Sequence, residues 1–247
     1  MTTTPPPVAP HTTSSDTATG RIPQQNGTLH AGRSRAFTTW VEQVCREDAG
    51  ARSALRSGLR KELDSVRRMH RLVAPWLPEP RSADMERAYY TVAAMIAAQP
   101  RSAPAAHDHT AAGPAQPDEQ VFSHTPQRRR TSLGTAFAIA VTAGPGREKE
   151  MRAGTAESRL NLLTRQSVNG LHRHLPASVA YLRSVGVEVD WAQLLDDLAA
   201  WRKDSGRISR TWLQDFYRLR DKDAAQQAAD ADAEDLTAEP TATSAGT

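Results

Sequence analysis

The sequence predicts an all-α protein: a compact bundle of about eight helices with disordered tails at both ends. Apolar residues recur three and four positions apart in several segments, which is the spacing of an amphipathic helix. Alternation of apolar and polar residues, the pattern of a half-buried strand, is nearly absent. Helices with one apolar face must bury it against other helices, so the pattern favours helix-on-helix packing.

The first hundred residues predict three helices. Their apolar stripes run over Phe37–Val44, Leu55–Val73 and Tyr89–Ile96. Pro75 ends the second helix and Pro100 ends the third, because proline cannot continue the hydrogen-bond ladder of a helix.

The middle of the chain predicts three more. Leu133–Val141 is short and mostly apolar, so a strand is possible there, but its alanines favour a buried helix. Another helix follows Thr155, and a further one covers Ala177–Val185.

Two helices close the bundle. The first carries the stripe Trp191–Trp201, with Asp190 as its N-cap and Gln193 completing a capping box. The second carries the stripe Trp212–Leu219.

Composition divides the chain into a folded body and two tails. Residues 1–34 are rich in Thr, Pro, Ser and Gly and are predicted to be a disordered tail. Residues 35–220 form the helical domain, which contains a Pro- and Ala-rich loop at 101–127. Residues 221–247 are an acidic, disordered tail whose first part could continue a helix.

Charge is unevenly placed along the chain. The whole sequence has a net charge of +3, whereas residues 221–247 hold seven acidic residues and one lysine, a net −6. The preceding 220 residues therefore carry +9. A basic body suggests a polyanionic partner, usually nucleic acid. The basic residues are mostly arginine, whose planar fork matches phosphate, although a genomic bias towards arginine codons would give the same ratio.

Several classes of protein are excluded by composition and motif. The single cysteine, Cys45, allows no internal disulfide, and no apolar run is long enough to span a membrane. The first residues do not resemble a secretory signal, so a cytoplasmic protein without a membrane partner is expected. Metalloprotease, paired-cysteine, phosphate-loop and dinucleotide-binding motifs are absent, so we expect no enzyme, no metal and no cofactor.

The remaining candidates for chemistry are weak. His107, Asp108 and His109 could bind a metal, but they lie in the Pro/Ala-rich loop, where no scaffold would hold their geometry. Asp196 and Asp197 could be nuclease carboxylates, although a solvated helix face is the simpler interpretation. Four tryptophans lie on apolar stripes and are expected in the core rather than as base-stacking platforms.

Arginines are the better candidates. Arg52, Arg56 and Arg60 are spaced every four residues and would form one ridge of a helix. Like charges at this spacing repel unless an anion meets them, so the ridge predicts nucleic-acid binding, with a solvated face as the alternative.

Six segments of the sequence form a recognisable set. They are DAGARSALR (48–56), HRLVAPWLP (70–78), SLGTAFA (132–138), ESRLNLLTR (157–165), VEVDWAQLLDDLAAW (187–201) and WLQDFY (212–217). In order and spacing, from about Arg35 to Arg218, the set resembles the CasB family, the small subunit of the type I-E CRISPR complex Cascade.

The resemblance implies a non-catalytic helical subunit that works in antiviral defence. Its expected partners are the large subunit and the guide-RNA backbone subunits of Cascade, and a second copy of itself. It would contact the guide RNA and the target DNA, including the displaced strand, and stabilise the R-loop; in such complexes base pairing reads the sequence and protein holds the backbone.

Residue by residue, the resemblance places basic family positions at Arg56, Arg159, Arg165 and Arg207. Ser57 and Ser158 stand where the family often has a further arginine. With the ridge residues Arg52 and Arg60, these form the predicted nucleic-acid-binding set. The alternative function is a stand-alone helical DNA-binding regulator, which would need a helix-turn-helix with base-reading side chains.

Overall fold

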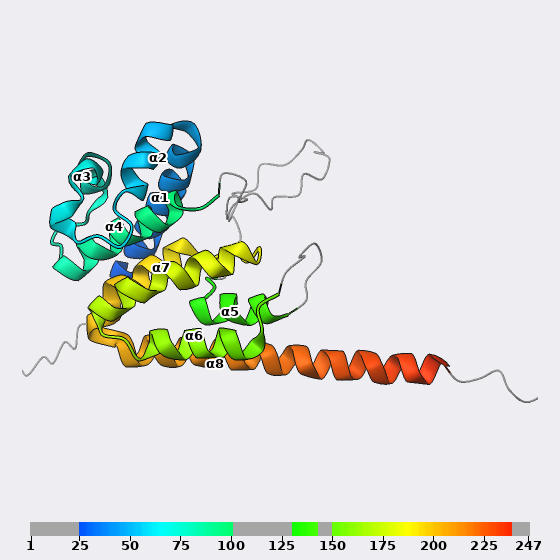
Figure 1. Ribbon diagram of the computed structural model, residues 1–247. Coiled ribbons are helices and arrows are strands. Elements are labelled where there is room, and N and C mark those ends of the chain that lie inside the picture. Colours follow the sequence, from blue (N-terminus) through cyan, green and yellow to red (C-terminus); the bar gives the residue numbers. More distant parts are fainter. Residues whose placement is uncertain (1–24, 101–129, 143–149, 239–247) are drawn as a thin grey trace, which may run out of the picture.

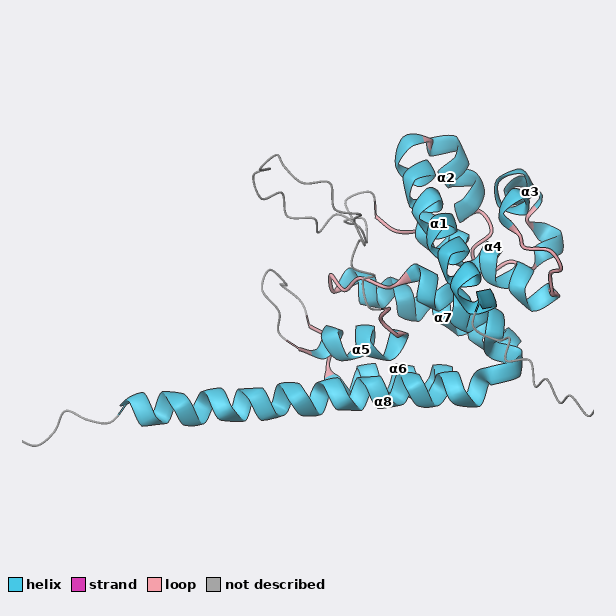
Figure 2. Cartoon of the chain, turned by 180° about the vertical axis from the view of Figure 1, so that it is seen from behind, coloured by secondary structure: helices cyan, strands magenta, loops and turns pink. Residues whose placement is uncertain are grey.

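The computed structural model describes residues 25–100, 130–142 and 150–238, and within them it confirms the all-α prediction. Figure 1 shows two groups of helices: α1–α4 pack together on one side, and on the other side α5 and α6 lie against the long helix α8, with α7 packed on α4, α5 and α6. Figure 2 shows from behind that α8 extends well beyond the body. The loop at 101–127, with His107 to His109, lies outside the described residues.

The first two helices meet at Asp48. Helix α1 spans Gln25–Glu47, so it begins ten residues ahead of the predicted start of the domain, and α2 spans Ala49–Arg56. The Asp48 carboxylate accepts hydrogen bonds from the backbone N–H groups of Gly50 and Ala51, at 2.7 and 2.9 Å, and so satisfies two donors at the start of α2.

The single helix predicted over Leu55–Val73 is wrong. Helix α2 ends at Arg56, and short 3₁₀ turns η1 (Leu63–Ser65) and η2 (Ala74–Trp76) flank α3 (Arg67–Val73). Arg60 has a positive φ of 61°, a conformation that no helix contains. The chain turns tightly at Gly58, where a Cβ atom would lie 2.1 Å from the Met69 sulfur.

Helix α4, Ala83–Ala97, lies at the centre of the molecule. Ser82 caps it by accepting a hydrogen bond from the Met85 N–H at 3.2 Å. Its second half is buried almost continuously, from Ala88 to Ala97, because α1, α2, α3, α7 and α8 all pack against it. A helix that is apolar on nearly all sides is expected at such a place.

Helix α5, Leu133–Val141, is the buried helix that its alanines predicted. The Ser132 hydroxyl caps it, accepting from the Thr135 N–H at 3.3 Å and donating to the Asp215 carboxylate at 2.7 Å. Gly134 lies so close to α8 that a Cβ atom would be 1.8 Å from the Trp212 carbonyl oxygen. The small residues of this segment therefore let two backbones touch.

Helices α6 (Ala153–Thr164) and α7 (Val168–Ser184) are separated by a turn at residues 165–167. Ser167 caps α7, which therefore starts nine residues before the predicted Ala177. Pro176 lies inside α7 without ending it.

Helix α8, Trp191–Ala238, joins the last two predicted helices across a bend at Asp204, whose φ and ψ are −125° and 18°. The bend folds the two arms towards each other. The Trp201 and Trp212 rings lie 5.2 Å apart between centroids, and the Trp212 indole N–H donates to the Asp197 carboxylate at 2.7 Å. Residues fifteen positions apart in a straight helix would lie about 22 Å apart along its axis.

The long arm of α8 continues far into the predicted acidic tail. Thr142, at the end of α5, donates a hydrogen bond to the Asp223 carboxylate at 2.7 Å. Residues 224–233 beyond this contact are all exposed. Alanine and glutamine are good helix formers and the next proline is Pro240, so the sequence favours continuation of the helix to Ala238.

Candidate nucleic-acid interface

The predicted arginine ridge is not one ridge. Arg56 is the last residue of α2 and is exposed, whereas Arg60 lies in the turn after it, also exposed. Arg52 is half-buried, and its guanidinium donates to the backbone carbonyls of Ala97, at 3.1 Å, and of Gln99. Arg52 thus satisfies carbonyl groups at the end of α4, and only Arg56 and Arg60 present their charge to solvent.

Arg183 resembles Arg52 in its contacts. Its guanidinium donates to the Gln99 side chain and to the Val187 carbonyl, both at 3.2 Å. Burial lowers the pKa of Arg183. Its hydrogen bonds join the end of α4 to the turn after α7, so Arg183 has a structural role.

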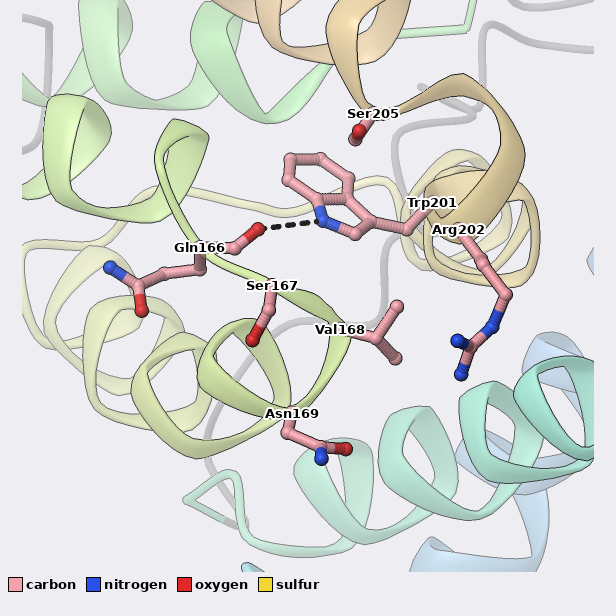
Figure 3. Close-up of a pocket in the computed structure, with 7 residues that line it drawn as sticks. All are labelled: Gln166, Ser167, Val168, Asn169, Trp201, Arg202 and Ser205. Carbon is pink, nitrogen blue, oxygen red and sulfur yellow. Dashed lines mark hydrogen bonds between the residues drawn. The ribbon is translucent and has the colours of Figure 1, made fainter.

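Arg165 lies at the turn between α6 and α7 and is exposed. The next residue, Gln166, accepts a hydrogen bond on its carbonyl from the Trp201 indole at 3.1 Å, as Figure 3 shows. This bond fixes the turn against the bend of α8. The bend presents two further exposed basic residues, Arg202 and Lys203, which sequence reasoning missed.

The pocket in Figure 3 lies at this junction. It has a volume of about 290 Å³ and is lined by the start of α7 and by Trp201, Arg202 and Ser205 of α8. The Arg202 guanidinium donates to both oxygens of the Asp84 carboxylate at the start of α4. These hydrogen bonds lower the pKa of Asp84 and hold Arg202 at the mouth of the pocket.

A polar seam connects the two basic regions. Arg87 of α4 donates to the Glu62 carboxylate at 3.2 Å and to the Asn169 side chain at the start of α7. Glu62 is two residues after Arg60, and Asn169 is four residues after Arg165. The structure therefore brings the end of the α2 turn and the α6–α7 turn to either side of Arg87, although they are about a hundred residues apart in the sequence.

Arg159 is half-buried and stacks on an aromatic ring. Its guanidinium carbon lies 4.7 Å from the centroid of the Tyr181 ring on α7. Such a contact holds the planar group in place while its edge stays available for hydrogen bonds. We therefore expect Arg159 to stabilise the α6–α7 pair as well as contribute charge.

Arg207 lies just after the bend, exposed, with its guanidinium 3.2 Å from the Asp204 carboxylate. It lines a small cavity of about 160 Å³ together with Arg130, Asp197 and Asp215. Arg130, in the segment before α5, is bound to the Asp196 carboxylate.

The adjacent carboxylates Asp196 and Asp197 are not a solvated face, and that expectation is wrong. Asp197 is 9% exposed and accepts from the Trp212 indole at 2.7 Å and from the Gln193 amide at 2.8 Å. Burial raises its pKa to about 6 despite these bonds. Asp196 accepts from Ser34 and Arg130. Both carboxylates connect separate parts of the fold, so the role of the pair is structural.

The capping-box prediction is correct for Asp190 and wrong for the Gln193 side chain. The Asp190 carboxylate accepts from the Gln193 N–H at 2.9 Å, which confirms Asp190 as the N-cap. The Gln193 side chain, however, points to Asp197 instead of back to the cap.

Other candidate groups are structural where the structure describes them. Cys45 is half-buried, and burial raises the pKa of its thiol to about 11. His172 is buried against Thr91, with its Nδ1 2.9 Å from the threonine hydroxyl, and burial lowers its pKa to about 4. Within the described ranges no three His, Cys, Asp or Glu residues are grouped so that they could hold a metal ion. No helix there combines the length and the apolar character needed to cross a bilayer.

Comparison with known proteins gives one consistent result. The profile of the family described as CRISPR-associated protein Cse2 matches residues 51–217. A chain of a solved CRISPR RNA-guided surveillance complex is 35% identical, with a TM-score of 0.64, and the match covers 81% of this chain and 99% of that chain. A chain of a pre-nicking surveillance complex is 36% identical, with a TM-score of 0.64 and coverage of 80% and 98%.

More distant structures share the fold. The M. ruber CasB structure is 21% identical with a TM-score of 0.56, and the match covers 78% of this chain and 97% of that chain. A Cse2-family protein from Thermus thermophilus is 21% identical, with a TM-score of 0.52 and coverage of 74% and 97%. No curated protein sequence matches the chain.

Proposed function

Because the chain belongs to the Cse2 (CasB) family of CRISPR-associated proteins, we propose that it is a non-catalytic small subunit of a type I-E Cascade ribonucleoprotein. In this role it binds nucleic acid through its arginine-rich surface and stabilises the R-loop, including the displaced DNA strand. Its partners are the other Cascade subunits, the guide RNA and the target DNA, and a second copy of the chain.

The observation that carries this proposal is the exposed basic residues of two turns that Arg87 links through Glu62 and Asn169. Arg56 and Arg60 are exposed and precede Glu62 by six and two residues, and Arg165 is exposed and precedes Asn169 by four. Lys203 is exposed at the bend of α8, beside Arg202, whose guanidinium is paired with Asp84. No base-reading motif was found in the sequence, and a surface of this kind binds phosphate without regard to sequence. That is the task of a subunit whose complex leaves sequence recognition to base pairing.

The test is a double charge reversal, Arg56→Glu with Arg165→Glu, in the assembled complex. Two attractions for phosphate become two repulsions, so target-DNA affinity and R-loop lifetime should fall several-fold or more. The matched control is Arg46→Glu with Arg152→Glu, which changes the net charge equally. Arg46 and Arg152 are also exposed, but they lie just before α2 and α6, and the test residues lie at the ends of those helices.

Each outcome has a distinct meaning. An unchanged R-loop lifetime, in complexes that contain the subunit at normal stoichiometry, removes Arg56 and Arg165 from the binding surface. Loss of the subunit from the complex shows that the two residues serve assembly. Tight binding of the isolated protein to one DNA sequence would favour the stand-alone regulator instead.

A further inference from the structure

One face of the long arm of α8, just after the bend, is lined by exposed polar and aromatic side chains. At 100° per residue, Arg207, Arg210, Gln214, Tyr217 and Arg218 fall within an arc of about 100°. The core-facing residues of the same turns point the opposite way: Ile208, Trp212 and Phe216, all buried. The face is therefore a defined strip along the helix.

Tyr217 is the aromatic residue of this strip. It is 39% exposed and is one of three large hydrophobic side chains that are exposed in the described part of the chain. Its hydroxyl donates to the Glu157 carboxylate of α6 at 2.7 Å, and its ring packs edge-on against Phe216 with centroids 5.2 Å apart. The ring is thus held in one orientation with part of its surface open to solvent.

Around the ring lies a shallow groove of about 610 Å³. Arg210, Leu213, Gln214 and Arg218 line it with Tyr217, and Asp221 lines it as well. Arg210 and Arg218 are exposed and lie within about two helical turns of the ring along the axis. An aromatic surface between two guanidinium groups matches the alternation of base and phosphate in an unpaired strand, whereas a duplex hides the faces of its bases.

We propose that this strip of α8 binds an unpaired nucleic-acid strand, with one base stacked on Tyr217 and the neighbouring phosphates at Arg210 and Arg218. The proposal rests on the proposed function and names a separate surface for it. From Arg207 to Arg218 the helix rises about 16 Å, enough for only a few nucleotides. Asp221 and Asp223 follow directly, and their charge ends the basic strip on that side.

The experiment compares Tyr217→Ala with Tyr217→Phe in the full chain. Phenylalanine keeps the ring and loses the bond to Glu157, so it separates stacking from the structural role of the hydroxyl. Binding to an oligothymidylate and to a duplex of the same length is measured at low salt. Tyr217→Ala should weaken single-strand binding about fivefold or more, while duplex binding stays within about twofold and Tyr217→Phe behaves as wild type.

A second variant tests the phosphate contacts. Arg210→Gln with Arg218→Gln should weaken binding to both probes and lower the salt slope for the single strand by about 0.7 per arginine that contacts a phosphate. Equal losses for both probes in Tyr217→Ala would overturn stacking, as would a loss shared by Tyr217→Phe. Release of Tyr217→Ala from the assembled complex without any change in oligonucleotide binding would also overturn the proposal, because the strip would then be a protein contact.

Failure of this proposal and failure of the proposed function can be told apart. If the strip is wrong but the function is right, Tyr217→Ala leaves single-strand binding intact while the Arg56/Arg165 charge reversal still shortens R-loop lifetime. If the function is wrong, the chain does not co-purify with guide RNA and the other Cascade subunits, whatever the strip does.

Discussion

Gly134 sets the distance between α5 and α8. A Cβ atom at this position would lie 1.8, 2.5 and 2.8 Å from the carbonyl oxygen, carbonyl carbon and Cα of Trp212. These are backbone atoms, so no side-chain rotation can make room. Any side chain here must push α5 away from the helix on which it packs.

Gly134→Ala should therefore destabilise the protein by about 3 kcal/mol, and the Tm should fall by roughly 6 to 12 °C. The control is Gly154→Ala in α6, where a Cβ atom would meet nothing within 4 Å. There the methyl group should leave stability unchanged or raise it slightly, because alanine is the better helix former. Thermal melts of both variants measure the two Tm values. Equal Tm values would mean that α5 moves away from α8 at no cost in stability.

Asp197 makes stability depend on pH in an unusual direction. Its folded pKa of about 6 lies above the ordinary value of 3.8, so the folded protein binds the proton more tightly than the unfolded chain. The contribution is fully present below about pH 4 and is lost as the pH rises through about 6. Buried His172 acts oppositely, because its lowered pKa makes the folded state lose stability as the pH falls.

Asp197→Asn isolates the first effect, since asparagine cannot titrate. The unfolding free energy of the wild type minus that of the variant should decrease by about 2 kcal/mol between about pH 4 and about pH 7. Denaturant unfolding at several pH values measures this difference, and the contribution of His172 cancels in it. A difference that stays constant, or increases with pH, would show that burial does not control the Asp197 carboxyl.

Single residues also explain why the site was only partly predictable. Arg52 and Arg56 have the same residue type and neighbouring positions, yet only Arg56 is exposed. The carbonyl groups that bind Arg52 come from the end of α4, about forty-five residues away. Periodicity within one helix cannot reveal such a partner. Arg202 and Lys203 were missed for a related reason: they become prominent only because α8 bends beside them.

At the scale of elements, the apolar stripes predicted where helices lie but not where they end. The stripe over residues 55–73 continues through a region that is not helical, because Gly58 packs against Met69, and Arg60 has positive φ. Conversely, two predicted helices belong to one bent helix, since only Asp204 leaves the helical φ and ψ range and α8 continues after it. Ends and bends depend on contacts distant in sequence, which a stripe does not contain.

The exposed end of α8 should contribute nothing to the stability of the body. Residues 224–233 are all exposed, so they bury no surface against the body. A chain that stops after Ala224 should unfold within about 0.5 kcal/mol of the full chain, while its helical circular dichroism falls.

The control for this truncation is a chain that stops after Arg220. It loses Asp223 and with it the hydrogen bond from Thr142 that joins α8 to α5. We expect this shorter chain to be less stable by about 1 kcal/mol. Equal stability of the two shortened chains would mean that the Thr142–Asp223 contact is unimportant.

For the whole molecule, the acidic end opposes the basic body. Removing residues 225–247 deletes five acidic residues and no basic ones, which changes the net charge from +3 to +8. Non-specific duplex binding should become tighter at low salt, and the two binding curves should converge at high salt, where the Debye length is about 3 Å. Affinities that differ equally at all salt concentrations would point to a direct contact by the tail.

Two pairs of neighbouring tryptophans give each half of the molecule its own optical signal. Trp40 and Trp76 lie 5.3 Å apart between ring centroids in the α1–α4 group, and Trp201 and Trp212 lie 5.2 Å apart at the bend of α8. Indoles this close share their electronic excitation and give a paired circular dichroism band, which Trp76→Phe or Trp201→Phe would silence separately. Since α4 packs on both α1 and α8, the two bands should vanish at one temperature. Two separate temperatures would show that the halves melt as independent units.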